Sequence, residues 1–291
     1  MYGGASARPF ITYHNSLDQS LYLRIADELY LKRLIIGGFE KVYEIAKNFR
    51  NEGMDRTHNP EYTSLEFYEA YADVYSMMDF TEELFKYVAN NNESLLFSYC
   101  GKDIDLSKPF EKISMFDLLE KYTNTDVSNM DIFDLIKLAK SKSLEITEDM
   151  NYGQVLDKLF GDLVEPNLYK PTFVTDYPKE ISPLAKENRE GKSGLVERFE
   201  LFIAGMEFAN SFSELNDPIE QRKRLEAQVQ LHEAGDEEAQ VIDENFLHAM
   251  EIGMPPTGGV GIGVDRLIML LTDQKSIKDV ILFPALRKEK D

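Results

Sequence analysis

The sequence has a single cysteine, Cys100, and no apolar run that approaches the length of a membrane span. One cysteine cannot form an internal disulfide, which excludes disulfide-rich secreted domains and favours a reducing compartment. A membrane-spanning helix needs about 20 apolar residues in succession, and the N-terminal residues do not form a signal pattern. We therefore expect a cytoplasmic protein without a membrane partner.

Basic residues are also scarce in this chain. The 32 lysines and arginines are outnumbered by 52 aspartates and glutamates, so that the formal net charge is −20. Because phosphate contacts need clustered Lys and Arg, this balance argues against a general nucleic-acid-binding surface, although it allows a small basic patch at one site. The 291 residues, 43% of them hydrophobic, suffice for one large domain or two small ones.

Apolar residues at helical spacing organise the middle of the chain. The spacing predicts a helix from Met77 to Asn90 and further helices near 131–143 and 152–164. Ser114 precedes another helical pattern as its candidate N-cap.

Residues 91–165 contain no catalytic pattern, and we interpret them as a helical insertion in a single catalytic domain, residues 1–291. Residues 42–46 and 63–73 predict two strands of an antiparallel hairpin that a long polar loop connects. Three residues of the second strand are expected to pack on one face: Leu65, Phe67 and Tyr71.

The loop of this hairpin, residues 49–62, carries several polar residues suited to a charged ligand. Arg50 and Glu52 are two apart on a predicted strand, which places both on one face. A guanidinium suits a phosphate or carboxylate, and Glu52 could accept from an adenine amine. A surface ion pair is the alternative for these two residues alone. His58 is placed to meet a distal phosphate, and Tyr62 could stack on a base.

Two glutamates of a second hairpin, residues 199–212, suggest a metal site. If the chain turns at residues 203–204, Glu200 lies opposite Glu207 on the same face. Like charges there are destabilising unless a cation lies between them, and Mg²⁺ takes one or two carboxylates and completes its shell with water and phosphate. An exposed acidic edge is the alternative.

Asn210, Phe212 and Glu214 alternate along the strand that leaves this hairpin. Simple alternation places them on the face opposite Glu207. A β-bulge near Ala209 is therefore needed if both sets serve one site.

Near the C-terminus, a glycine-rich turn from Gly258 to Gly263 precedes an apolar helix with Arg266 in its first turn. Glycines allow the backbone to approach a ligand closely. An arginine at a helix start is not favoured by the helix dipole, but it can stack on a nucleobase. Together with the 49–62 loop, this turn indicates a nucleoside triphosphate site that is neither a P-loop nor a Rossmann motif.

These motifs resemble those of the catalytic domain of class II lysyl-tRNA synthetases. FRNE (49–52) with HNPEY (58–62) resembles motif 2 of that class, and GIGVDR (261–266) resembles motif 3. The lysine-specific members are resembled by GGASARPF (3–10), by residues 21–45 and by NSFSELND (210–217). The resemblance covers nearly the whole chain. The family's anticodon-reading OB-fold domain and motif 1 are not found in it, so we expect a truncated member.

The resemblance implies an α+β fold, an antiparallel sheet flanked by helices with the active site on the sheet. The implied reaction is the activation of L-lysine with ATP to lysyl-adenylate, followed in the full-length protein by lysine transfer to tRNA(Lys). Mg²⁺ is the implied metal cofactor. The parent protein is expected to be a homodimer.

Roles for individual residues follow from the same resemblance. The implied catalytic residues are Arg50 and Arg266. The implied lysine-binding residues are Gly4, Glu28, Arg50, Glu66, Tyr68, Asn210, Phe212 and Glu214. The implied ATP-binding residues are Arg50, Glu52, His58, Asn59, Tyr62, Glu200, Glu207, Gly263 and Arg266, and Glu200 and Glu207 also hold Mg²⁺. Tyr68 and Glu214 would bind the ε-ammonium of lysine, while Tyr62 and Arg266 would enclose the adenine.

Two alternatives remain open at this point. One is a truncated paralogue that binds lysine or ATP without aminoacylation, although such paralogues usually lose the arginines and metal carboxylates that this chain keeps. The other is a lysyl-transferase acting on a protein, like the relatives that modify elongation factor P, which the GGASARPF opening disfavours. Glu28 and Glu214 disfavour a relative specific for aspartate or asparagine, because acidic side chains repel an acidic substrate.

Overall fold

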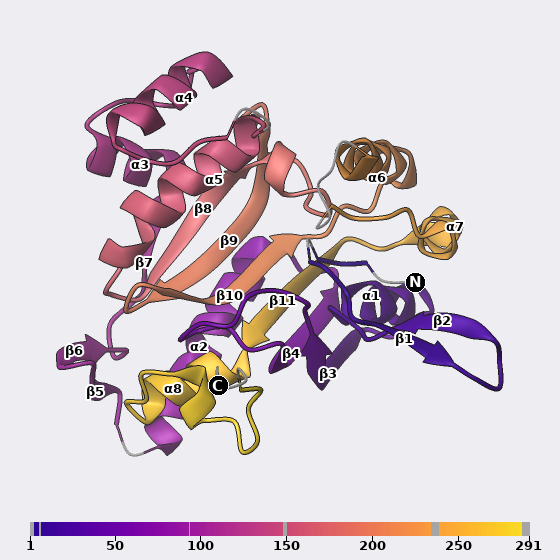
Figure 1. Cartoon of the computed structure of the whole chain (residues 1–291), viewed down its shortest axis with the longest axis horizontal. Helices are drawn as coiled ribbons and strands as arrows, with labels where there is room; N and C mark the ends of the chain where they lie inside the picture. Colours follow the sequence, from indigo (N-terminus) through magenta and orange to yellow (C-terminus); the bar gives the residue numbers. More distant parts are fainter. Residues whose placement is uncertain (1–2, 6, 93, 148–149, 234–238, 287–291) are drawn as a thin grey trace, which may run out of the picture. The chain divides into compact units, whose positions relative to one another are not determined.

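The computed structural model describes residues 3–5, 7–92, 94–147, 150–233 and 239–286. The chain divides into two compact units, whose elements are labelled in Figure 1. Unit 1 comprises Met1–Asp73, Tyr99–Gly101 and Glu214–Asp291, and unit 2 comprises Val74–Ser98 and Lys102–Ser213. The expected single domain with a helical insertion stays a prediction.

Unit 1 is built on three neighbouring antiparallel strands in the order β3-β4-β11. These strands are β3 (Lys41–Phe49), β4 (Glu61–Ala70) and β11 (Thr257–Gly263). Its helices are α1 (Glu28–Ile36), α6 (Pro218–Glu233), α7 (Glu244–Gly253), α8 (Val264–Leu271) and the 3₁₀ turn η3 (Ile277–Asp279). A separate hairpin joins β1 (Ile11–His14) to β2 (Gln19–Tyr22).

Unit 2 contains four neighbouring strands in the order β10-β9-β8-β7, antiparallel except for the parallel pair β7 and β8. They are β7 (Glu111–Ser114), β8 (Thr172–Pro178), β9 (Leu195–Ile203) and β10 (Met206–Ser213). The helices are α2 (Val74–Asn91), α3 (Met115–Thr123), α4 (Ile132–Ser141) and α5 (Tyr152–Leu163). Shorter elements are β6 (Lys102–Asp105) and the 3₁₀ turns η1 (Glu165–Asn167) and η2 (Lys179–Ile181), and β5 (Leu96–Tyr99) ends at the unit boundary.

The helices predicted from apolar spacing are confirmed. Ser114 caps α3 by accepting a hydrogen bond from the backbone N–H of Asp117 at 3.0 Å. Asn151 and Gln154 form a reciprocal capping box at the start of α5. Buried residues of α3, α4 and α5 pack with those of β8 and β9 into one apolar core. The antiparallel strands and their flanking helices confirm the α+β fold class.

The buried face of β4 differs from the expected one. Ser64, Glu66 and Tyr68 are buried, whereas Tyr71 is 83% exposed, so its predicted packing is wrong. Burial still alternates from one residue to the next along β4, as expected for a strand. The polar set is buried because it lies opposite the glycines of β11, Tyr68 being paired with Gly259.

The hairpin of β9 and β10 turns one residue later than expected. Ala204 and Gly205 both have positive φ angles, 54° and 76°, as a tight two-residue hairpin turn requires. The predicted pairing of Glu200 with Glu207 is therefore wrong: Glu200 pairs with Asn210, and Glu207 pairs with Phe202. The predicted bulge is confirmed, because the register shifts between Glu207 and Ala209.

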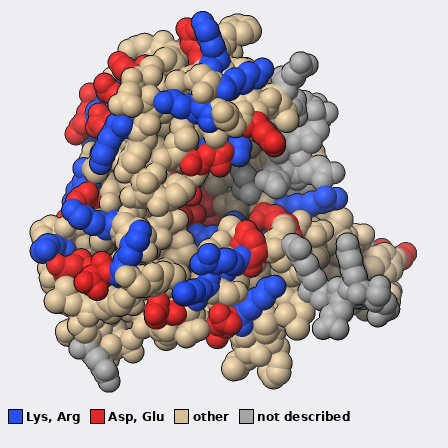
Figure 2. All heavy atoms as spheres, turned by 60° about the vertical axis from the view of Figure 1, so that its left-hand side comes forward, with Lys and Arg blue, Asp and Glu red and all other residues tan. Residues whose placement is uncertain are grey.

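Charged side chains of both signs share the surface. On the face drawn in Figure 2, the coloured Lys and Arg side chains are interspersed with Asp and Glu. Exposed ion pairs such as Arg222 with Glu244 contribute to this mixture. None of the helices in the described ranges has the length and apolar character to cross a bilayer.

Candidate active site

The polar face of β4 forms one side of an acidic cluster in unit 1, which we define as Glu28, Glu66 and Glu214. Glu66 is 7% exposed. Its Oε2 accepts from the hydroxyl of Tyr68 at 3.0 Å, and its Oε1 accepts from the backbone N–H of Asp27 at 3.0 Å. Burial, together with Glu28, raises the pKa of Glu66 to about 7.

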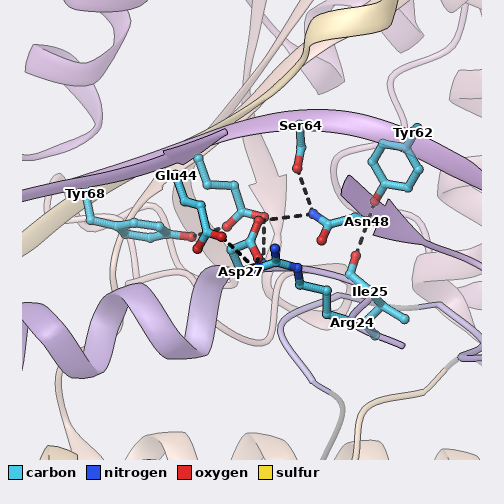
Figure 3. Close-up of polar contacts among 9 residues, drawn as sticks. Arg24, Ile25, Asp27, Glu44, Asn48, Tyr62, Ser64 and Tyr68 are labelled. Atoms are coloured by element: carbon cyan, nitrogen blue, oxygen red, sulfur yellow. Dashed lines mark hydrogen bonds and ion pairs between the residues drawn. The ribbon is translucent and has the colours of Figure 1, made fainter. Parts of the chain in front are cut away.

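A hydrogen-bonded network holds Asp27 in place at the start of α1 (Figure 3). Its carboxylate accepts from Arg24 Nη1 at 2.8 Å and from Asn48 Nδ2 at 3.3 Å. Asn48 Nδ2 also donates to Ser64 Oγ at 2.7 Å, and Arg24 Nη1 also donates to Glu44 Oε1 at 2.8 Å. The network fixes the backbone N–H that binds the Glu66 carboxylate.

Glu214 is the most buried member of the acidic cluster, at 1% exposure. Its Oε2 forms an ion pair with Lys32 Nζ, whereas its Oε1 accepts no hydrogen bond from any residue that the structure describes. A Cβ at Gly259 would lie 2.2 Å from that oxygen and 2.3 Å from Tyr68 Cε1. Only glycine at this position lets Tyr68 and Glu214 lie side by side over β11.

Gly4 and Glu28 lie together at the start of α1. Gly4 has a φ of +92°, and a Cβ there would be 3.0 Å from the Cβ of Glu28. Glu28 is 7% exposed and forms an ion pair with Lys32 one helical turn later. Six of the eight predicted lysine-binding residues thus lie in unit 1: Gly4, Glu28, Arg50, Glu66, Tyr68 and Glu214.

Arg50 lies beside Tyr62, with its guanidinium 5.3 Å from the ring centroid. Its Nε is buried and has no hydrogen-bond acceptor among the described residues. Burial raises the pKa of Tyr62 to about 12, and its hydroxyl donates to the carbonyl of Ile25 at 3.2 Å. The expected placement of Arg50 and Glu52 on one strand face is wrong, because β3 ends at Phe49.

His58 connects the loop after β3 with the start of α8. Its Nδ1 is 2.8 Å from Asp55 Oδ2, and its Nε2 is 3.0 Å from Arg266 Nη2. Burial opposes ionisation of Asp55, but hydrogen bonds from Thr57 and His58 hold its pKa at about 2. Two segments far apart in sequence therefore meet through His58, as their pairing in the sequence predicts.

The glycine-rich segment is a strand rather than a turn, because residues 257–263 form β11, antiparallel to β4. Gly263 lies at the N-terminus of α8, where an added Cβ would be 3.7 Å from the Arg266 side chain. Asn59 is buried near this end of β4, and its Nδ2 donates to the carbonyl of Glu61 at 2.7 Å. Its Oδ1 has no partner in the described part of the chain.

In unit 2, the hairpin of β9 and β10 carries Glu200, Asn210 and Phe212. Arg198 forms an ion pair with Glu200 Oε1, and its Nε donates to Asn210 Oδ1 at 3.0 Å. The hydroxyl of Tyr177 donates to Glu200 Oε2 at 2.7 Å. Arg198 therefore fixes both neighbours and leaves the Asn210 amide nitrogen as the available donor. Phe212 packs against the apolar core of unit 2.

The carboxylates of Glu200 and Glu207 interact as like charges. Burial and the nearby Glu207 raise the pKa of Glu200 to about 7 against the opposing effect of Arg198. Their oxygens are donors that Mg²⁺ prefers, and a cation would relieve the repulsion, so the pair fits this ion. Within the described ranges, no group of three or more His, Cys, Asp or Glu side chains could hold a metal. Water or phosphate would have to complete its shell.

Comparison with known proteins agrees with the family resemblance of these motifs. The family profile of the class II tRNA synthetases (D, K and N) matches residues 1–287. The chain belongs to the class II tRNA synthetases. It is 54% identical to the lysine–tRNA ligase of Thermoanaerobacter sp. over 291 residues, which are 99% of this chain and 58% of that protein. Lysine–tRNA ligases of Trichormus variabilis and Porphyromonas gingivalis are 56% and 52% identical over 99% of this chain.

The chain spans between 50% and 58% of the length of these three curated relatives. The matched segment includes the two motifs of class II synthetases that the sequence contains, FRNE with HNPEY and GIGVDR. Both motifs lie in unit 1, and the two glutamates expected to bind metal lie in unit 2.

Lys32 of unit 1 and Arg198 of unit 2 were not among the sequence candidates, and Gly259 was considered only as part of a glycine-rich turn. Each carried a weak signal in the sequence. Glu28 and Lys32 are four apart, the spacing of a helical ion pair. Gly259 interrupts an apolar run in which the alternation of glycine could have indicated a strand with one bare face. Arg198 is two residues before Glu200, as a same-face neighbour on a strand must be.

Proposed function

We propose that the chain is the catalytic core of a lysine–tRNA ligase, which activates L-lysine with ATP and, as the full-length protein, charges tRNA(Lys). The observation that carries this proposal is the buried carboxylate oxygen of Glu214, which has no partner among the described residues. A buried ammonium group needs an anionic partner. A neutral or acidic amino acid would leave that oxygen unpaired or repelled, which is a strong basis for selectivity.

In this proposal the two ammonium groups of lysine bind to the acidic cluster. Glu214 and Tyr68 receive the ε-ammonium, which suits the free Oε1 beside the phenol ring. Glu28 and Glu66 receive the α-ammonium, with Gly4 leaving space next to Glu28. Asn210 would donate to the lysine carboxylate, since Arg198 occupies its amide oxygen, and Phe212 would contact the aliphatic stem.

ATP would bind through the motif residues of unit 1. Arg50 would bridge the lysine carboxylate and the α-phosphate, and its buried Nε, which has no acceptor among the described residues, supports an anionic ligand there. Glu52 would accept from the adenine amine, while Tyr62 and Arg266 would enclose the ring. His58 and Asn59 would lie by the phosphates and base, with the backbone at Gly263 near the nucleotide.

The reaction then requires no general base, because the lysine carboxylate is already a nucleophile. One carboxylate oxygen forms a bond to the α-phosphorus while the bond from that phosphorus to the bridging oxygen breaks, releasing pyrophosphate. Arg50 stabilises the negative charge that builds up on the α-phosphate oxygens, and its position also orients the attack.

Glu200 and Glu207 would hold Mg²⁺, which supplies positive charge to the triphosphate when bound. Arg198 and Tyr177 orient Glu200 toward that task through their contacts with its two oxygens. Each carboxylate oxygen keeps a second lone pair for a cation.

The test is lysine-dependent exchange of pyrophosphate into ATP by the purified chain. Exchange with L-lysine, and with none of the other standard amino acids, is the expected result. Lysine and ATP binding measured by calorimetry without exchange would contradict a catalytic role and leave a ligand-binding protein. Exchange that depends equally on another amino acid would contradict the assignment of the acidic cluster.

We also propose that the protein acts in the cytoplasm as a homodimer. Support for the dimer comes from β3, the edge strand of unit 1, on which Tyr43 and Ile45 are 73% and 63% exposed. Exposed apolar edge strands are avoided in monomers because they associate with other chains.

A further inference from the structure

Lys32 is a fully buried lysine that the proposed reaction does not use. It lies on α1 at 0% exposure and forms ion pairs with Glu28 and with Glu214 Oε2. Four titratable groups surround its partner Glu214 from α1 and β4, namely Lys32, Glu28, Glu66 and Tyr68. Lys32 thus lies between the carboxylates of Glu28 and Glu214, both of which are proposed to bind the substrate. Burying a charged lysine costs desolvation free energy, so a functional role for its charge is worth considering.

The charges of this group balance when lysine is added. When all three carboxylates are ionised, Glu28, Glu66 and Glu214 contribute −1 each and Lys32 contributes +1, so the group carries −2; Glu66, with a pKa of about 7, reaches this state as the pH rises through neutrality. The two ammonium groups of free lysine cancel that charge, while its carboxylate is proposed to bind Arg50 and Asn210. Without Lys32 the occupied site would retain one uncompensated negative charge in buried surroundings, which is strongly unfavourable.

We propose that Lys32 is a positioning residue that makes the site selective for lysine: its ammonium holds the Glu214 carboxylate so that Oε1 remains free for the substrate ε-ammonium. This inference rests on the proposed function. The contact with Oε2 draws one oxygen toward α1, and the opposite oxygen then lies against Gly259 and Tyr68.

The ammonium of Lys32 also favours the ionised form of the carboxylate, although burial holds the pKa of Glu214 well above its usual value. Burial raises the pKa of Glu214, Lys32 lowers it, and Glu28 and Glu66 raise it further. The same pairs with Glu214 and Glu28 outweigh burial at Lys32 and raise its own pKa. Removal of Lys32 therefore shifts Glu214 toward its protonated form. A protonated carboxyl group donates a hydrogen bond, and it cannot pair with an ammonium by charge.

The experiment compares two ligands on the purified chain by titration calorimetry between pH 6 and pH 9. One ligand is L-lysine, and the other is 6-hydroxynorleucine, in which a neutral hydroxyl replaces the ε-ammonium. The variant is Lys32→Met, which keeps the length of the side chain and removes its charge. Lys86→Met is the matched control, because Lys86 forms the same kind of i,i+4 helical pair, with Glu82 on α2.

We expect Lys32→Met to bind L-lysine at least about tenfold more weakly at pH 7, since each unit by which the pKa of Glu214 rises above the ambient pH lowers its ionised fraction about tenfold. Affinity for 6-hydroxynorleucine should change much less, so the preference for lysine falls. Raising the pH should restore lysine binding to the variant as Glu214 ionises. Lys86→Met should match the wild-type chain with both ligands.

An equal loss of affinity for the two ligands, or unchanged lysine binding, would overturn the role of Lys32 and leave the proposed function intact. A wild-type chain that does not bind L-lysine would overturn the proposed function itself.

If Lys32→Met does not fold, Lys32→Gln replaces it, since its amide can donate without charge. In the wild-type chain, a ¹⁵Nζ signal of Lys32 typical of a neutral amine at pH 7 would also overturn the proposal.

Discussion

Gly259 controls the contact between the two side chains proposed to bind the ε-ammonium. Its backbone does not need a positive φ, so alanine is allowed conformationally, but a Cβ would collide with Glu214 and Tyr68. We expect Gly259→Ala to weaken lysine binding at least about tenfold and to lower the free energy of unfolding by about 1–3 kcal/mol through overpacking. Calorimetry with L-lysine and with ATP separates the effects, because ATP affinity should persist.

Gly261→Ala is the matched control for that substitution. It lies on the same strand, and its added Cβ would be 3.8 Å from Glu66 Cγ, an ordinary contact. Equal effects of the two substitutions would show that strand flexibility, rather than the collision at Glu214, explains the loss.

The pKa of Glu66 predicts a pH dependence of stability. Burial raises this pKa from 4.5 to about 7, so the native state binds more protons than the unfolded chain between these values. The contribution of Glu66 to stability is present below about pH 4.5 and is lost as the pH rises through about 7, on the order of 3 kcal/mol in total.

Glu66→Gln should therefore gain stability relative to the wild-type chain as the pH rises from 5 to 8. Glutamine cannot ionise, yet its amide oxygen can still accept from Tyr68 or from the Asp27 backbone. Urea unfolding at several pH values measures the difference between the two proteins. A difference that stays constant across this range would contradict the raised pKa.

The sequence predicted which residues form the acidic cluster, but it did not predict which side chains contact them. Every carboxylate of the acidic cluster was a sequence candidate, and the structure brings the three together in unit 1. Lys32 was missed because helical ion pairs are common on surfaces, and only the fold shows that this one is buried. Gly259 was interpreted as part of a turn because glycine is depleted in strands, and the alternation of glycines is only a weak signal for one.

At the scale of elements, apolar periodicity and N-cap residues were enough to predict the helices. The register of β9 and β10 could not be predicted in the same way, because it depends on the position of the turn between them. The β9–β10 hairpin turns at Ala204 and Gly205 rather than one residue earlier, and this shift changes every cross-strand partner. Glu200 thereby lies opposite Asn210, and the bulge after Glu207 alters the alternation that follows. The sequence did carry a signal for the observed turn, because glycine at position 205 readily adopts the positive φ of a hairpin turn, whereas the β-branched Ile203 does not.

Arg198 connects the β9–β10 hairpin to the segment at residues 181–182 through hydrogen bonds. Beyond Glu200 and Asn210, its Nη1 donates to the carbonyl of Ile181 and to Ser182 Oγ, each at 2.8 Å. We expect Arg198→Lys to lose most of these bonds, since an ammonium cannot reproduce the planar fork. Unfolding free energy should fall by about 3 kcal/mol. Pyrophosphate exchange should fall about 100-fold or more as Glu200 and Asn210 shift.

Arg222→Lys provides the comparison for Arg198→Lys. Arg222 donates two hydrogen bonds to Glu244, at 2.8 and 2.7 Å, but the pair is exposed to solvent. Exposed pairs contribute little, so neither stability nor exchange should change appreciably. If the two variants behave alike, the orienting role of Arg198 is contradicted.

For the whole molecule, charge and apolar exposure act in opposite directions. A net charge of −20 keeps copies of the chain apart at long range. Exposed apolar side chains on β3 favour association once copies touch, and salt reduces the repulsion between them. Association should therefore strengthen as salt concentration rises, which distinguishes apolar contact from pairing between opposite charges.

The proposed homodimer gives the prediction at this scale. Replacing both Tyr43 and Ile45 with lysine places charges on the exposed face of the edge strand, which opposes pairing with a second copy. We expect the wild-type chain to sediment as a dimer at micromolar concentration and the double variant to sediment as a monomer, both in about 0.15 M salt, where the Debye length is about 8 Å. Phe133→Lys is the control, because Phe133 is 78% exposed on α4 of unit 2. Dissociation by Phe133→Lys as well would mean that added positive charge, rather than the apolar surface of β3, determines association.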